Sequence, residues 1–535
     1  MDSSQKMIKA SVTASTNSQY NFPEQTTEFL AATTNCGICF SGGGTRAMSA
    51  AMGQMRGLNN LGILKNARYI SCVSGGSWAS SVYTYYKSGP SNDNELLGTS
   101  PNSSERLTWT LTDWTNNLAS YNLAYPATSD FRNTLLGYMD KHPINMAWSY
   151  AVRDVFFQPF GLDDANYFSL DSTSVDNALN ANKTLQPNWS SDNFDITQSD
   201  RPYLIVNGTL MWPIEVGHTV NRVLVQFTPL YTGNPFALQL KEKHLLEKPS
   251  TLNTGGGVLD SYAFGSSGPN TAPGKALEMP EPTVPFSIWH ASGISSTAYG
   301  YDFAKYHVIE GYIPQMNYWA VTDSSESQSE TAMQYFADGG NLENNGIMAM
   351  LQRKVEKIIV FVNSETPISK NAKGTIVIDS DMPSYFGLQN AAFPNNTLFE
   401  SSEYQTLLDG LWESNKTQNG LAMHSQTYTT IENTWFGTPS YSVEVLWVYN
   451  SPVQKWIDTL SPDMQATVNE GISGKGPLKN FPNYSTIGEE WFHLVELSAP
   501  QVSTIADMFA WSIEQNASTF EALLAPTSTS NEPEQ

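Results

Sequence analysis

The sequence predicts an α/β fold in which a mixed, mainly parallel sheet lies between two layers of helices. Two short apolar runs, residues 36–40 and 68–73, have the length and composition of buried strands. Each run is followed by a glycine-rich turn and then by a helical pattern, and this repeated unit is how a parallel α/β sheet begins. The composition agrees, because the 535 residues are 40% apolar and only 15% charged, which is typical of a large buried core.

The individual elements follow from local patterns along the chain. Apolar residues at helical spacing run from Met48 to Gly62, and a second helix is expected to begin at Gly75 and to end near Tyr86. Further strands are expected at residues 203–206, 223–227, 335–337 and 357–363, with a helix at about 347–355 before the last of them.

Charge and cysteine content exclude several classes of function. The net charge of −23 weighs against nucleic-acid binding and against recruitment to an anionic membrane by a polybasic patch. Cys36, Cys39 and Cys72 are too few for a disulfide framework, and no second Cys/His pair completes a zinc site, so they are interpreted as buried core. Neither a metal nor an organic cofactor is expected. No export-type apolar segment or bilayer-spanning stretch is visible, so a cytoplasmic location with peripheral membrane contact is expected.

Ser74 is the first candidate for chemistry. It lies in the stretch SCVSGGSW, between an expected strand and an expected helix, where a tight turn would project its hydroxyl at the carboxyl end of the sheet. Glycine at positions 75 and 76 permits the turn, and the amide of Gly75 can point at a developing oxyanion. A Ser-Gly-Gly turn by itself is more often a plain loop.

Two further motifs carry polar groups suited to the same chemistry. In SGGGTRA, residues 41–47, consecutive glycine amides before a helix form a donor site for an anion, and Arg46 adds a charge suited to a phosphate. Such a loop could also cradle a nucleotide phosphate, but it lacks the spacing of a P-loop or a dinucleotide site. Asp338, followed by two glycines at a strand end, could hold a carboxylate near a nucleophile, although an Asx turn explains the same pattern.

Taken together, these motifs resemble the catalytic domain shared by the cytosolic phospholipase A2 enzymes and the fungal lysophospholipases (phospholipase B), and more distantly the patatins. The resemblance rests on FSGGGTRAMSAAMG, on LGILKNARYISCVSGGSW and on the DGG of FADGGNLENN, while FTPLYTG looks like a further motif of that family. These segments lie between Cys36 and Asn345.

The resemblance implies a Ser–Asp dyad, which maps onto Ser74 and Asp338. It implies an oxyanion hole from the backbone amides of Gly43 and Gly44, beside that of Gly75, and an arginine, Arg46, that steadies a phosphate head group. The expected substrate is a phospholipid or lysophospholipid, met transiently at a membrane or micelle surface.

Two residues depart from the family pattern. Cys72 stands where the family usually has glycine, and Gly346 stands near a frequent proline, so the loop after Asp338 is expected to differ in shape.

The resemblance also suggests a domain organisation. A single catalytic domain is expected over residues 36–525, after an N-terminal extension at 1–35 and before a polar tail at 526–535. Residues 105–200 read as a helical insertion, and residues 247–284, rich in Gly, Pro, Ser and Thr, read as a long loop. A mobile cap over an apolar channel is expected within residues 90–200 or 247–284.

Two alternatives stay open at the level of sequence. An α/β-hydrolase with a Ser-His-Asp triad fits the chain order if His424 or His493 is the base. A catalytically silent lipid-binding or storage protein on the same fold is the other. The sequence does not distinguish sn-1 from sn-2 cleavage, or phospholipase from lysophospholipase or transacylase activity.

Overall fold

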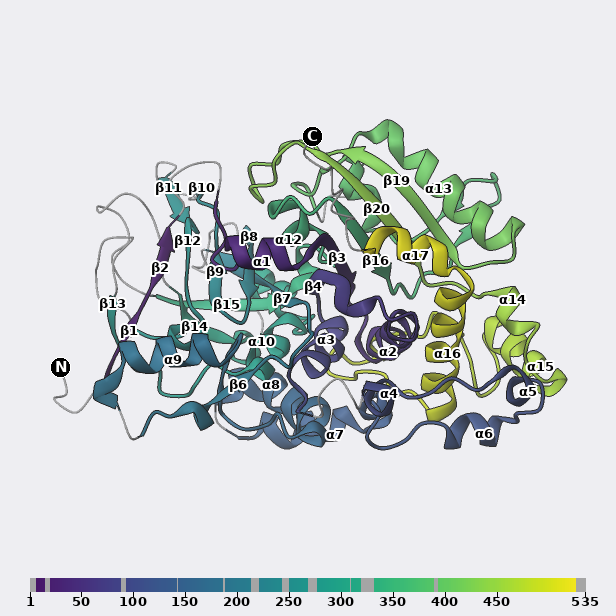
Figure 1. The fold of residues 1–535 in the computed structure, drawn as a ribbon, viewed down its shortest axis with the longest axis horizontal. Coiled ribbons are helices and arrows are strands. Elements are labelled where there is room, and N and C mark those ends of the chain that lie inside the picture. Colours follow the sequence, from purple (N-terminus) through teal and green to yellow (C-terminus); the bar gives the residue numbers. More distant parts are fainter. Residues whose placement is uncertain are drawn as a thin grey trace, which may run out of the picture.

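One mixed sheet forms the middle of the molecule (Figure 1), and twelve strands of the described part of the chain belong to it. The computed structural model describes residues 6–14, 20–87, 93–141, 143–185, 188–212, 221–242, 250–267, 277–307, 309–318, 332–388 and 393–525. In spatial order the strands of the sheet are β19 (Ala422–Thr429), β20 (Ser442–Tyr449), β16 (Lys357–Val362), β3 (Thr34–Phe40), β4 (Ala67–Cys72), β7 (Tyr203–Trp212), β8 (Asn221–Phe227), β9 (Tyr231–Asn234), β12 (Gly257–Asp260) and β2 (Val12–Ala14), with β15 (Ala332–Asp338) on β7 and β14 (Gln315–Tyr318) on β15.

The sheet is mixed, as predicted, and its parallel strands are grouped at the centre. Strands β20, β16, β3, β4 and β7 pair in parallel, whereas the described pairings on either side of this group are antiparallel. Short connections account for part of the antiparallel region, because β8 and β9 are separated by only a few residues and a parallel pair needs a long crossover. The antiparallel extension is therefore larger than the sequence pattern indicated.

Strand β7 carries two partners along one of its edges. Its first half pairs with β4, with Val206 opposite Cys72, and its second half pairs with β15, with Gly208 opposite Asp338. Strand β8 occupies the other edge. The ends of β4 and β15 therefore meet beside the middle of β7.

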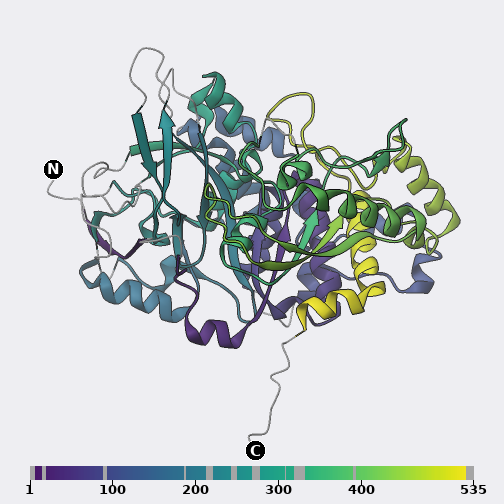
Figure 2. The same ribbon diagram turned by 90° about the horizontal axis from the view of Figure 1, so that it is seen from above.

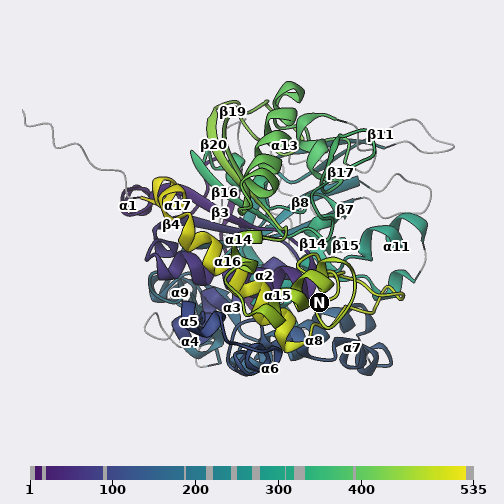
Figure 3. The same cartoon turned by 90° about the vertical axis from the view of Figure 1, so that its right-hand side faces the viewer.

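Helices cover both faces of the sheet (Figures 1 and 3). One face carries α2 (Gly44–Asn60), α3 (Gly75–Tyr85) and α16 (Ala499–Gln515), and the other carries α12 (Ile347–Gln352) and α13 (Tyr404–Trp412). Alternate strand residues enter separate cores, as a pleated strand requires: Ile38 and Phe40 pack on the first side and Cys39 on the second. The three-layer α/β/α prediction is confirmed.

The two ends of the molecule hold different parts of the chain. Figure 2 shows the N-terminal strands at one end and the C-terminal helices at the other. The other α-helices, and the other strands of four or more residues, in the described part of the chain are α1 (Thr27–Ala32), α4 (Asp93–Leu97), α5 (Ser103–Arg106), α6 (Leu111–Asn116), α7 (Phe131–Met139), α8 (Ala147–Val152), α9 (Ser172–Ala181), α10 (Ile288–Ser295), α11 (Gly300–Tyr306), α14 (Gln454–Ile457), α15 (Pro462–Ile472), α17 (Ala517–Leu524), β1 (Met7–Ala10), β10 (Leu238–Glu242), β11 (Ser250–Thr254) and β13 (Leu277–Pro280).

Two expectations about the insertions have different outcomes. The prediction of a long loop at 247–284 is wrong, because its described residues include β11, β12 and β13, and β12 pairs with β9 and β2 in the central sheet. Backbone pairing outweighed a composition that is typical of loops. Residues 105–200 are largely helical, as predicted. Whether either region acts as a cap stays a prediction.

The cysteine prediction is confirmed. Cys36, Cys39 and Cys72 are free thiols buried in β3 and β4. Burial raises the pKa of the Cys72 thiol, which donates to the carbonyl of Ile205 at 3.4 Å.

Candidate active site

Ser74 occupies the sharp turn between β4 and α3. Its backbone has φ +52° and ψ −125°, a left-handed conformation that side chains other than glycine rarely adopt. Hydrogen bonds to α10 hold the turn in place: the Ser74 amide donates to both the carbonyl (3.1 Å) and the hydroxyl (3.0 Å) of Ser295, the last residue of that helix. Strain of this kind is kept only where surrounding structure enforces it, and it is common at functional sites. Only 8% of Ser74 is exposed.

The glycine loop lies directly against this turn. A methyl group on Gly75 would lie 2.1 Å from the carbonyl oxygen of Gly44, so the two backbones are in contact. Gly43 and Gly44 lead into α2, and Gly75 begins α3. Within the described part of the chain, no acceptor is paired with the amides of Gly43, Gly44 or Gly75. Unpaired amides at two adjacent helix N-termini are suited to a negatively charged oxygen.

Asp338 ends β15 on the other side of Ser74. Its carboxylate accepts hydrogen bonds from the Gly340 amide at 2.6 Å and from the Ser74 side chain. Burial of the carboxyl group, of which 4% is exposed, raises its pKa to about 7, although both hydrogen bonds favour the charged form. A carboxylate that titrates near neutral pH is a better base than an ordinary aspartate.

The middle of β7 holds the two sides of the site together. Asn207 donates to the carbonyl of Cys72 at 3.1 Å, and Thr209 donates to the carbonyl of Asp338 at 2.8 Å. Ser295, which supports the Ser74 turn, donates to the carbonyl of Asn207 at 2.6 Å. The spacing of Ser74 and Asp338 is therefore set by a buried framework of hydrogen bonds.

Asn344 is a site residue that the sequence did not reveal. A methyl group on Gly42 would lie 2.2 Å from Asn344 Oδ1 and 3.0 Å from Ser74 Cβ, and one on Gly340 would lie 2.7 Å from the same Oδ1 and 3.1 Å from Asp338 Oδ1. The carboxamide thus fills the gap between the glycine loop and the turn after Asp338. Only its position in the stretch DGGNLENN hinted at this role.

Arg46 lies beside the glycine loop, but most of its guanidinium donors already form hydrogen bonds within the protein. Its Nε donates to the carbonyl of Asn363 at 2.9 Å, and its Nη1 donates to the Thr486 hydroxyl at 2.9 Å and to the Tyr484 carbonyl. Its Nη2 faces Gly43. Only 3% of the residue is exposed, and burial lowers its pKa to about 10, so it stays charged at neutral pH. The predicted role in phosphate binding stays a prediction.

A C-terminal segment, residues 484–497, covers the glycine loop. Thr45 donates to the carbonyl of Val495 at 2.6 Å, and a methyl group on Gly44 would lie 2.8 Å from both Leu494 and Thr486. Nothing local in the sequence places this segment at the site, because its contacts join residues more than 400 positions apart.

The two candidate histidines lie in other settings. His424 is on the edge strand β19, against Gly410 of α13, and His493 is in the C-terminal segment, against Gly488. In the described part of the chain, neither is a hydrogen-bond partner of Ser74 or Asp338.

Gly346 fits the departure noted in the sequence. It precedes α12 with φ +77°, whereas proline is held near −65°, so the loop after Asp338 takes a path that proline could not follow.

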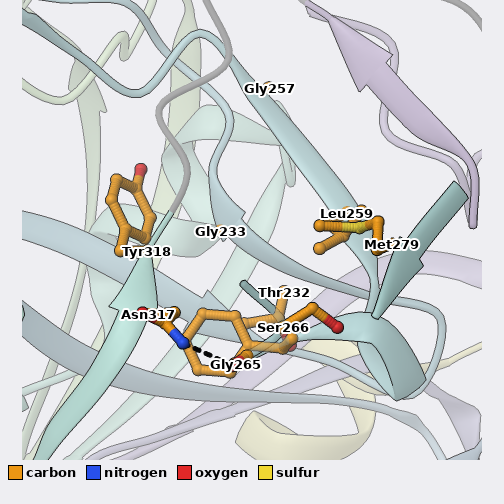
Figure 4. A pocket seen from close by; sticks show the side chains of 10 residues that line it. Thr232, Gly233, Gly257, Leu259, Gly265, Ser266, Met279, Asn317 and Tyr318 are labelled. Atoms are coloured by element: carbon orange, nitrogen blue, oxygen red, sulfur yellow. Dashed lines mark hydrogen bonds between the residues drawn. The ribbon is translucent and has the colours of Figure 1, made fainter. Parts of the chain in front are cut away.

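Several other features bear on ligand and membrane binding. The described side chains form no cluster of three or more His, Cys, Asp or Glu residues that could hold a metal ion. Among the described helices, none is both long and apolar enough to cross a bilayer. A small pocket between β9, β12 and β14, which includes Thr232, Leu259 and Asn317, is lined by neither Ser74 nor Asp338 (Figure 4).

Comparisons with known proteins point to one group. No family model matches the chain. A segment of 67 residues, 12% of this chain, is 43% identical to the cytosolic phospholipase A2 zeta of Mus musculus and covers 8% of that protein. The resemblance to cytosolic phospholipase A2 enzymes is confirmed over that segment.

Matches to solved structures extend over a longer stretch of the chain. Human GIVD cytosolic phospholipase A2 matches 91% of this chain with 13% identity and a TM-score of 0.45. The same protein in complex with methyl γ-linolenyl fluorophosphonate matches with a TM-score of 0.39. This chain spans 59% of the length of each of those chains.

Proposed function

We propose that this protein is a lipid acyl hydrolase that cleaves fatty-acyl esters of glycerophospholipids or lysophospholipids. The observation that carries the proposal is the contact between Ser74, strained at the tip of its turn, and the buried Asp338 carboxylate. The local identity to a cytosolic phospholipase A2 supports the same reaction class.

Acylation uses the dyad directly. The Ser74 hydroxyl attacks the ester carbonyl while Asp338 accepts its proton, which gives a tetrahedral intermediate and a neutral carboxylic acid. The unpaired amides of Gly43, Gly44 and Gly75 donate to the oxyanion as it forms. Collapse of the intermediate breaks the bond to the glycerol oxygen, which leaves with the proton from Asp338. The product is an acyl-serine.

Deacylation reverses these roles with water. Asp338 accepts a proton from a water molecule that attacks the acyl-serine, and the same amides stabilise the second oxyanion. Expulsion of Ser74 with that proton releases the fatty acid. Because a carboxylate is a weak base for a serine, the raised pKa of Asp338 and the prepared amides supply much of the rate.

The substrate class follows from the charge at the site. Arg46 places a positive charge beside Gly43. Its Nη1 pairs with the Glu365 carboxylate at 3.5 Å, and we propose that a phosphate head group near the scissile ester meets the Nη2 side. We infer a cytoplasmic location with transient contact to a membrane or micelle surface. We also propose that the protein has no nucleic-acid partner and uses no metal or organic cofactor. The domain limits given above belong to the same proposal.

Fatty-acid release from phosphatidylcholine and lysophosphatidylcholine micelles tests the function. Wild type and a His424→Ala/His493→Ala variant are expected to release fatty acid, whereas Ser74→Ala and Asp338→Asn are expected to lose activity. The preferred substrate distinguishes phospholipase from lysophospholipase. Activity that survives Ser74→Ala would overturn the mechanism, and loss in the histidine variant would favour a triad.

If the wild type releases no fatty acid, labelling with a fluorophosphonate decides between explanations. A serine that labels indicates a hydrolase for another ester. A serine that does not label, in protein that is folded, favours a silent lipid-binding protein.

A further inference from the structure

The C-terminal segment over the glycine loop forms a hairpin. The Val495 amide donates to the Thr486 carbonyl, the Gly488 amide donates to the His493 carbonyl, and Ile487 pairs with Leu494. We propose that this hairpin, residues 484–497, is a strap that closes over the Ser74–Asp338 pair and opens to admit the acyl ester. The inference rests on the proposed function.

The root of the strap is attached to the glycine-loop side of the site by hydrogen bonds that are buried or partly buried. The carbonyl of Tyr484 and the hydroxyl of Thr486 accept from Arg46, and the carbonyl of Val495 accepts from Thr45. Both donors belong to the first turn of α2, next to Gly44. The root is therefore fixed to the loop that we propose binds the oxyanion.

The tip of the strap is attached on the side of the base. Trp491 packs against Tyr299 at 4.4 Å and against Phe303 at 5.0 Å between ring centroids. Tyr299 closely follows Thr297, whose carbonyl accepts the amide of Asp338 at 3.1 Å. A hairpin with its root at Gly44 and its tip beside these residues bridges the two sides of the dyad.

An ion pair adds a second attachment at the tip. Arg132, at the start of α7, donates two hydrogen bonds to Glu490 Oε2 at 2.9 and 2.8 Å, and its guanidinium lies 5.4 Å from the centre of the Phe492 ring. These side chains are 36% and 45% exposed, so water can compete for the pair. The tip is therefore held more weakly than the root.

Opening at the tip explains how a lipid could reach the dyad. Ser74 and Asp338 are almost fully buried, whereas an ester carbonyl must come within about 3 Å of the serine oxygen to react. Release of Glu490 and Trp491 would lift the hairpin about its root and leave the amides of the glycine loop in place. Arg132 and Trp491 would then govern access to the site.

The rate at which a small alkyl fluorophosphonate labels Ser74 measures access without requiring lipid binding. Arg132→Ala is expected to label about twofold to fivefold faster than wild type, because an exposed ion pair contributes little to closure. Trp491→Ala should label faster still, with Trp491→Phe between it and wild type. Lys141→Ala is the matched control, because this substitution also removes a cation, but one that lies over the Tyr138 ring and does not contact the strap.

Fixing the strap shut gives the opposite result. In Arg132→Cys/Glu490→Cys, a short bismaleimide should join the two thiols and abolish labelling, because the three native cysteines are buried and do not compete. Each single cysteine variant, treated in the same way, lacks the ion pair and has no second thiol to join, so it should label faster than wild type, as Arg132→Ala does.

The outcomes separate the two proposals. If wild type fails to label and behaves like Ser74→Ala, the hydrolase proposal falls. If wild type labels but neither Arg132→Ala nor the cross-link changes the labelling rate, the strap does not open to control access and this inference is wrong. Faster labelling in the Lys141→Ala control would also overturn it.

Discussion

Gly75 and Gly44 meet backbone to backbone, so that the turn bearing Ser74, the proposed nucleophile, contacts the loop that we propose donates to the oxyanion. The two segments belong to successive strand-turn-helix units, and their contact joins the N-termini of α2 and α3. The proposed donors and the proposed nucleophile are therefore joined by direct backbone contact.

Gly75→Ala should disrupt this unit. The added methyl group would lie 2.1 Å from the Gly44 carbonyl, a distance that forces the turn and the loop apart. We expect a loss of activity of at least about 100-fold, typical of a displaced oxyanion donor, with a lower melting temperature. Gly137→Ala in α7 is the control: its methyl group meets nothing within 4 Å, and we expect a gain of about 0.5–1 kcal/mol in unfolding free energy. Normal activity in Gly75→Ala would contradict the close contact.

The pH dependence of hydrolysis should report Asp338. Because burial raises the pKa of this carboxyl group to about 7, the free enzyme holds the required carboxylate only above that pH. We expect kcat/KM to fall about tenfold per pH unit below pH 7 on a neutral ester. If kcat/KM instead begins to fall only near pH 4, another group, or an ordinary solvated carboxylate, acts as the base.

Asp338→Asn should trade activity for stability. The folded protein binds this proton more tightly than the unfolded chain, so the carboxyl group favours folding below pH 4 and this contribution is lost as pH rises through about 7. Asparagine cannot ionise and keeps an oxygen for the Gly340 amide. We expect the variant to unfold with a free energy higher than that of wild type by up to about 4 kcal/mol at pH 8.

Denaturant unfolding at two pH values checks this expectation. The difference between Asp338→Asn and wild type should be large at pH 8 and small at pH 4. An equal difference at both pH values would mean that the native carboxyl group titrates normally.

Asn344→Asp should move the acidic limb of the pH profile. The new carboxylate would lie close to the Asp338 carboxylate, and a like charge raises the pKa of its neighbour. We expect the limb to shift upward by about half a unit to one unit. Asn341→Asp is the matched control, because Asn341 belongs to the same turn but donates to the Ala298 carbonyl instead. Equal shifts in both variants would contradict the special position of Asn344.

Local sequence patterns predicted the part of the fold that carries the dyad. The strands expected at 36–40 and 68–73 are β3 and β4, and the helices expected after them are α2 and α3. Glycine turns and apolar periodicity are local signals, so they can be read without knowledge of the tertiary structure. The strand expected at 335–337 is the end of β15, which delivers Asp338.

Long-range contacts account for what the sequence did not indicate. Strand β12 lies in a segment whose composition is typical of a loop, and its pairing with β9 and β2 supplies the order. The packing of Thr486 and Leu494 on Gly44 has no local signature either. Arg46 was expected to face a substrate, and its partners Asn363 and Tyr484 could be found only from the folded chain.

The double pairing of β7 makes the chemistry independent of most of the chain between its two parts. Cys72 and Asp338 are placed by partners only two positions apart on one strand, so the distance between nucleophile and base is a matter of register. Apart from β7 and the supporting residues Ser295 and Thr297, the long stretch that connects them can lengthen, shorten or change composition without altering that distance. Evolution is thus free to remodel the covering segments, and with them the proposed lipid preference, around an unchanged Ser74–Asp338 pair.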